Sequence, residues 1–168
     1  MLSPIYPFHV LAQLPSVLQN SINMILALPE FNLFVFAFLL NFVYEVWQSP
    51  FYEFYKAPEL ADKVRAMTRC TLGDATIAVV CSLIVSAILR SRQWIISPST
   101  AAIIWFTALP WLYTLFSEIY RTRIAKMYGV RGLVVPGLKI SAFPLIQWLI
   151  LPSFILWFAR YQILGQQL

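Results

Sequence analysis

Three polar residues lie close together near the end of a long apolar stretch that begins near Phe31. Asn41, Glu45 and Gln48 are spaced i, i+4 and i+7, so a helix places all three side chains on one face. A carboxylate in an apolar setting can act as a general acid or as a counter-ion, and neighbouring amides can orient a bound molecule. We therefore predict Glu45 as the key acid and candidate catalytic residue, with Asn41 and Gln48 as ligand-binding residues.

The composition is that of an integral membrane protein. Hydrophobic residues make up 60% of the 168 positions and charged residues 11%, with a mean hydropathy of +0.73. Apolar stretches of about 20 residues can cross a bilayer as helices. The formal charge of +5 comes from basic residues between the apolar stretches, a pattern that predicts orientation in a membrane rather than binding to nucleic acid.

The apolar stretches predict an all-α integral membrane fold, a four-transmembrane-helix bundle with an N-terminal interfacial helix. The predicted spans cover residues 31–48, 71–89, 100–120 and 141–161. We divide the chain into an N-terminal interfacial segment at 1–30, a four-span transmembrane bundle at 31–161 and a C-terminal tail at 162–168. Residues 16–28 are too few to cross a bilayer, so we expect a helix on the membrane surface, with a re-entrant hairpin as the alternative. Trp94, between the second and third spans, suits an interfacial position.

Basic residues are unequally divided between the two sides of the predicted bundle. The first and third loops carry nine of them (Lys56, Lys63, Arg65, Arg69, Arg121, Arg123, Lys126, Arg131 and Lys139), and the other side carries three (Arg90, Arg92 and Arg160). Because cytoplasmic loops are enriched in Lys and Arg, we predict that the first and third loops are cytoplasmic and that both termini lie outside or in a lumen. The membrane is then a bacterial inner membrane or a eukaryotic endomembrane.

Further polar residues lie at a similar predicted depth in the other spans. Asp74 begins the second span, Glu118 ends the third, and Gln147 precedes Trp148 near the start of the fourth. The alternating direction of the spans brings these residues to the same half of the membrane as Glu45, where a bundle can form a pocket. We predict Asp74, Glu118, Gln147 and Trp148 as further ligand-binding residues. For the two acids, the alternative is an interfacial ion pair with a nearby arginine.

The sequence favours neither a metal centre nor a cofactor. Scattered carboxylates without histidine lack the Glu-x-x-His pattern of di-iron bundles, so we predict no metal site. His9 is the only histidine, and its segment favours an interfacial side chain over a haem ligand. Cys70 and Cys81 are about 16 Å apart along a helix, too far to form a disulfide. No nucleophile elbow, phosphate-binding loop or zinc-ligand spacing occurs.

Several short motifs along the chain, taken together, form a further pattern. They are Asn41 four residues before Glu45, Leu72-Gly73-Asp74, Trp94-Ile95 followed by Pro98, an aromatic-rich third span ending in Phe116 and Glu118, and Trp148-Leu149-Ile150-Leu151-Pro152. Together these pieces, spread over residues 41–156, resemble the EXPERA family of four-span proteins, which includes the emopamil-binding sterol isomerases and the sigma-receptor-like proteins.

The resemblance implies a bundle that holds a sterol or an amine between its helices. In the isomerases of that family, acidic residues move a proton around a sterol double bond. Three positions depart from the family pattern, because Asn41 replaces a histidine, Cys81 an acid and Leu145 an asparagine. These departures favour ligand binding over sterol isomerisation.

We therefore predict a polytopic membrane protein that binds a lipophilic, sterol- or isoprenoid-like ligand in an intrabundle pocket, with lipid isomerisation as the accompanying chemistry if one exists. One alternative is a non-catalytic accessory subunit of a larger membrane complex. A second alternative is a small proton-coupled transporter with Glu45 as its proton or cation site. The expected partners are membrane lipids or a lipophilic small molecule, a membrane protein or a second copy of the chain, and no nucleic acid.

Overall fold

The computed structural model describes residues 15–51, 59–126, 129 and 132–165. The α-helices in this part of the chain are α2 (Ser16–Leu26), α3 (Pro29–Gln48), α4 (Leu60–Leu89), α5 (Thr100–Ile119) and α6 (Phe143–Gly165). Shorter helical turns are η1 (Ser49–Phe51), η3 (Gln93–Ile95) and the π-helical η4 (Tyr120–Ile124). The predicted all-α fold is confirmed, since the described residues contain no strand beyond one isolated bridge between Val134 and Ser141.

Four helical segments are long and apolar enough to cross a membrane. They are Pro29–Phe51, Leu60–Leu89, Thr100–Ile124 and Phe143–Gly165. In a bilayer only helices and closed barrels satisfy all backbone hydrogen bonds internally, which is why continuous apolar helices are the expected elements. The chain is therefore a polytopic integral membrane protein, as the sequence predicted.

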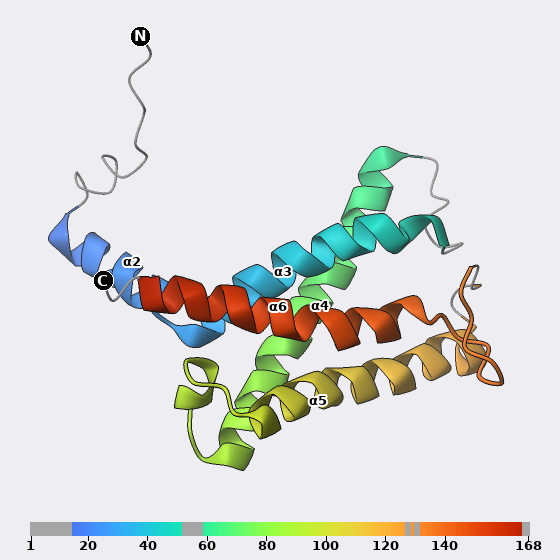
Figure 1. The fold of residues 1–168 in the computed structure, drawn as a ribbon. Coiled ribbons are helices and arrows are strands. Elements are labelled where there is room, and N and C mark those ends of the chain that lie inside the picture. Colours follow the sequence, from blue (N-terminus) through green and yellow to red (C-terminus); the bar gives the residue numbers. More distant parts are fainter. Residues whose placement is uncertain (1–14, 52–58, 127–128, 130–131, 166–168) are drawn as a thin grey trace, which may run out of the picture.

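The four long helices form a bundle in which α4 crosses the others steeply (Figure 1). Helix α3 packs against α4 and α6, and α5 packs against α6 and α4. Helices α4 and α5 lie close together where the turn at 90–99 joins them, and they diverge away from that turn (Figure 1). We call the end of the bundle at this turn the closed end, and the opposite end, where η1 and η4 lie, the open end.

Small side chains are part of the buried core of the bundle. Ala37, Ala75, Ala78, Ala102 and Ala159 are all fully buried. Between membrane helices, small residues let the backbones approach closely, so that van der Waals contact holds the bundle together. The core is therefore built from tight helix crossings.

Local signals explain where the helices begin and end. Pro29 opens α3, where its missing N–H is not needed, and Glu30 in the same turn is favourable for the helix dipole. Ser99 caps α5, since its Oγ accepts a hydrogen bond of 3.2 Å from the backbone N–H of Ala102. Arg90 adopts a left-handed conformation with φ of 51° and ends α4.

Helix α4 differs most from the sequence prediction. It begins at Leu60 rather than at the predicted start of the second span at residue 71, so part of the predicted first loop forms its first turns. The sequence from Leu60 to Thr71 contains neither Pro nor Gly, and an ion pair of 3.3 Å between Arg65 and Asp62 supports the exposed first turns. Lys63, Arg65 and Arg69, counted above as loop residues, therefore lie on this helix.

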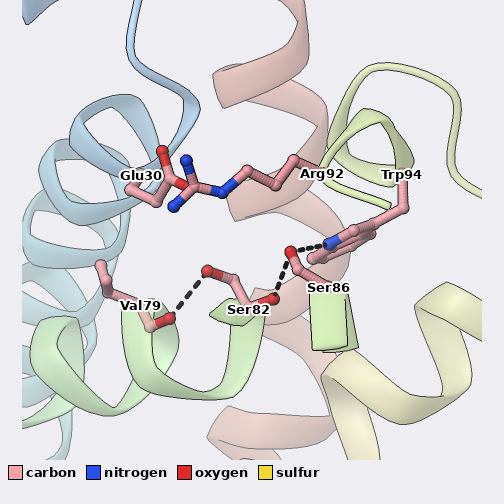
Figure 2. Close-up of polar contacts among 6 residues, drawn as sticks. All are labelled: Glu30, Val79, Ser82, Ser86, Arg92 and Trp94. Carbon is pink, nitrogen blue, oxygen red and sulfur yellow. Dashed lines mark hydrogen bonds and ion pairs between the residues drawn. The ribbon is translucent and has the colours of Figure 1, made fainter. Parts of the chain in front are cut away.

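The closed end is sealed by polar contacts around the turn at 90–99 (Figure 2). Arg92 pairs with Glu30 at 3.4 Å. Trp94 donates a hydrogen bond of 2.9 Å from Nε1 to Ser86 Oγ, and Ser86 Oγ donates to the Ser82 carbonyl at 2.9 Å. The prediction of an interfacial position for Trp94 is wrong, because η3 turns its side chain into the core, where it is only 4% exposed.

At the open end, the segment before α6 folds back onto the bundle. Ile140 and Ser141 are fully buried, and the rings of Phe51 and Phe143 stack with centroids 4.5 Å apart. Gly132 has a φ of 83°, and a Cβ there would approach Phe51 Cδ1 to 2.8 Å. The close aromatic packing explains why a glycine is needed at this position.

Candidate functional site

A cavity of about 620 Å³ opens at the open end, between the diverging helices α4 and α5. Helices α3 and α6 form its back wall. The residues that line it are Glu45, Gln48, Arg69, Cys70, Gly73, Asp74, Thr76, Ile77, Tyr113, Thr114, Ser117, Glu118, Arg121, Pro144, Gln147 and Trp148. The wall thus combines charged, amide, hydroxyl and aromatic side chains inside a membrane bundle.

Helical periodicity explains which residues of α4 line the cavity. Arg69, Gly73 and Thr76 are spaced i, i+4 and i+7, and Cys70, Asp74 and Ile77 repeat the same spacing one position later. This spacing places them on one face of the helix. A single face of α4 therefore lines the cavity, and its side chains change from charged at Arg69, at the open end, to apolar at Ile77, in the interior.

Helix α5 lines the opposite side of the cavity with a similar set of residues. Tyr113, Thr114, Ser117 and Glu118 lie on successive turns, and Arg121 follows in the π-helical turn η4. A π-helical turn shifts the direction of the side chains that follow it and is frequent at functional sites. In this chain the turn lies beside the cavity and carries one of its two arginines.

Six of the seven residues predicted from the sequence line this cavity. They are Glu45, Gln48, Asp74, Glu118, Gln147 and Trp148. Asn41 is fully buried behind the wall and reaches the cavity through Gln147. The structure therefore brings residues from all four long helices to one place.

A chain of hydrogen bonds connects three helices behind the cavity. Asn41 Nδ2 donates to the Ala37 carbonyl at 2.7 Å, and Asn41 Oδ1 accepts a hydrogen bond from Gln147 Nε2. Gln147 Nε2 also donates to Asp74 Oδ2 at 3.1 Å. Because the Ala37 carbonyl can only accept, the direction of every bond in the chain is fixed, and Asp74 is held through its Oδ2 atom.

Five charged side chains share the cavity. Three are acids, Glu45, Asp74 and Glu118, and two are arginines, Arg69 and Arg121. The charges of Glu45, Arg121 and Glu118 all act on the Asp74 carboxyl, so these groups form one electrostatic unit. Arg69 and Arg121, which are near Asp74 and Glu118 in the sequence, thus line the same cavity as these acids.

One buried amide oxygen of the cavity wall is available to a ligand. Gln48 is 2% exposed, and within the described ranges its Oε1 atom has no hydrogen-bond partner. A buried acceptor without a partner costs free energy, so a donor on a bound molecule would be favourable there.

The sequence did not single out several lining residues, among them Gly73, Thr76, Tyr113 and Ser117. Their spacing from Asp74 and Glu118 was the available signal, because residues one turn away share a helix face. His9, predicted to be interfacial, lies outside the described residues. In the part of the chain that is described, no group of three or more His, Cys, Asp or Glu residues is close enough to hold a metal ion.

The fold and the cavity define a class, a four-span integral membrane protein with a charged cavity between its helices. No family model, no curated protein and no solved structure matches the chain. The resemblance to the EXPERA family therefore stays a prediction that rests on the short sequence pieces given above.

Proposed function

We propose that this protein binds a lipophilic, sterol- or isoprenoid-like ligand in the cavity between α4 and α5, with Glu45 as the key acid. The observation that carries the proposal is the cavity itself, about 620 Å³ inside a membrane bundle and lined by residues of all four long helices. Ligand pockets for molecules of drug or lipid size lie in the range of about 300–1,000 Å³.

The chemistry of the walls supports an amphiphilic ligand. Ile77, Pro144 and Trp148 offer apolar contact, while Glu45 and Gln48 offer acceptors for a hydroxyl or another donor. A soluble polar metabolite would leave the apolar wall uncovered, and a pure hydrocarbon would leave the polar atoms without partners. A lipid with a polar group at one end satisfies both parts of the wall.

Glu45 is the acid to which we assign the central role. It is 7% exposed within a membrane-spanning helix, and ionisable residues at such positions are costly unless they serve a function. Isomerisation of the lipid requires that a proton be given at one carbon and removed at another. Glu45 and Asp74 face the same cavity and are the pair that supports such a transfer.

We also propose that the open end faces the cytoplasm. The excess of nine basic residues over three on the side of the first and third loops supports this orientation. The cavity then opens toward the cytoplasmic leaflet of the membrane.

The test is lipid analysis by mass spectrometry on protein purified in a mild detergent. We expect the wild type to carry a lipophilic molecule and Glu45→Gln to lose it. Glu30→Gln is the matched control, because it removes one carboxylate at the closed end, away from the cavity, and it should keep the ligand. A folded wild type without any bound lipophilic molecule would contradict the proposal.

The same preparation separates the alternatives. A stoichiometric membrane-protein partner in a mild-detergent pull-down would favour the accessory-subunit hypothesis. Proton-coupled flux into liposomes that Glu45→Gln abolishes would favour the transporter hypothesis.

A further inference from the structure

Two arginines lie at the mouth of the cavity, one on each side of the gap. Arg69 belongs to α4 and Arg121 to the π-helical turn η4, and both side chains are exposed. The acids lie farther in. Asp74 follows Arg69 by five residues, about 7.5 Å along α4 at the α-helical rise, and Glu118 near the end of α5 precedes Arg121 by three residues. A molecule that enters from the open end therefore meets two guanidinium groups first.

The cavity is also open from the side. Gly73 and Thr76 on α4 and Tyr113 on α5 line it and are exposed, Tyr113 by 53%. At Gly73, a Cβ would meet no atom within 4 Å. These residues lie within segments that can cross the membrane, and α4 and α5 diverge there (Figure 1). In a bilayer this opening faces lipid.

We propose that the ligand is a lipid phosphate that enters sideways between α4 and α5 and places its phosphate between Arg69 and Arg121. The inference rests on the proposed binding of a lipophilic ligand and specifies its polar group. Guanidinium groups bind phosphate through paired, charge-assisted hydrogen bonds. A lipid phosphate lies at the membrane interface, at the mouth where the arginines are, while its apolar chain extends along the opening toward Ile77 and Trp148.

The position of the charges favours a phosphate over a cationic group. A cationic group placed between the two guanidinium groups would be repelled by both of them, because like charges repel. One of the two arginines, Arg121, also interacts electrostatically with Asp74. A phosphate at the mouth gains two opposite charges and lies farther out than the acids.

The test compares ligands that differ only in the phosphate. Full-length protein in dodecyl maltoside, a detergent without phosphate, is titrated with farnesyl monophosphate, with farnesol and with inorganic phosphate. We expect farnesyl monophosphate to bind about ten- to a hundredfold more tightly than farnesol, the range expected for charge-assisted hydrogen bonds. Inorganic phosphate alone should bind much more weakly than farnesyl monophosphate, because it lacks the apolar contacts.

Matched variants locate the phosphate. Arg69→Gln and Arg121→Gln should each weaken farnesyl monophosphate binding about tenfold and leave farnesol binding unchanged. The controls are Arg65→Gln and Arg123→Gln, which remove the same charge nearby. Arg65 pairs with Asp62 on α4, and Arg123 donates to the Leu138 carbonyl at 2.9 Å. Both controls should bind farnesyl monophosphate as the wild type does.

Three outcomes would overturn the inference. They are equal affinity of the wild type for farnesol and farnesyl monophosphate, equal losses in the control variants, and inorganic phosphate binding as tightly as the lipid phosphate. The first comparison needs no variant, so misfolding of a variant leaves it decisive. If farnesol binds equally well and Glu45→Gln removes it, only the phosphate inference fails; if no lipophilic molecule binds or co-purifies, the proposed function fails as well.

Discussion

The polar side chains at the two ends of the bundle differ in what they contact. At the closed end, polar side chains end on partners within the chain, as in the Glu30–Arg92 pair and the bond from Trp94 to Ser86 (Figure 2). At the open end, three acids and two arginines line a cavity instead. Polar side chains at the open end also bond within the chain, as Gln147 does with Asp74, but several of them line the cavity as well.

The connections between the helices explain the difference. The turn at 90–99 joins α4 directly to α5, holds them together and places Trp94 between them, against Phe106 with ring centroids 5.3 Å apart. At the open end, where α4 begins and α5 ends, no turn joins these two helices to each other, and they diverge (Figure 1). A short link thus closes one end, and its absence leaves room for a cavity at the other.

The largest expected contrast between the ends is in thiol reactivity. Cys70 lines the cavity, whereas Cys81 is buried in the core, and neither residue forms a disulfide. Because a reagent must reach a thiol to modify it, we expect N-ethylmaleimide to modify Cys70 and to leave Cys81 unmodified in the folded protein. Peptide mass spectrometry reads the sites, and Cys70→Ser is the control. Modification of Cys81 at the same rate would mean that the core is as open as the cavity.

A large loss of stability is expected at the closed end. Trp94→Ala removes a buried ring and its bond to Ser86, which should lower the free energy of unfolding by about 3–5 kcal/mol. Trp105→Ala is the control, because Trp105 is 43% exposed on the outer surface and should cost much less. Unfolding in mixed micelles measures both variants. Equal losses of unfolding free energy in the two variants would contradict the stabilising role of Trp94 at the closed end.

A smaller loss is expected behind the cavity. Gln147→Leu removes the bonds to Asn41 and Asp74, and we expect a cost of about 1–3 kcal/mol in unfolding free energy, since a buried acceptor loses its partner. Combining it with Asn41→Leu should cost less than the sum of the two changes, because both act on one bond. Additive losses would show that the two amides do not interact.

The smallest effect is expected at the exposed pair of the closed end. Arg92→Gln breaks the 3.4 Å pair with Glu30 and should lower the unfolding free energy by less than about 1 kcal/mol, because Arg92 is largely exposed. High salt should weaken the pair in the wild type and so reduce the difference in unfolding free energy between the wild type and Arg92→Gln. A difference that is large and independent of salt would mean that the pair is shielded from water.

Much of the candidate site could be anticipated from the sequence. Glu45, Asp74 and Glu118 are acids within apolar stretches, and the alternating direction of the spans puts them at one end. The partners were harder to predict. The bond from Gln147 to Asp74 depends on how α6 is rotated against α4, and periodicity within one helix carries no information about the rotation of another.

The sequence alone determined the class of protein, the positions of four spans and the polar residues within them, because lipid requires apolar helices with internally satisfied backbones. Only the tertiary structure decided that Trp94 turns inward and that α4 and α5 diverge around a cavity. These features depend on contacts between helices, and in a membrane such contacts arise from close packing and hydrogen bonds rather than from hydrophobicity, which is the property that a sequence pattern reports.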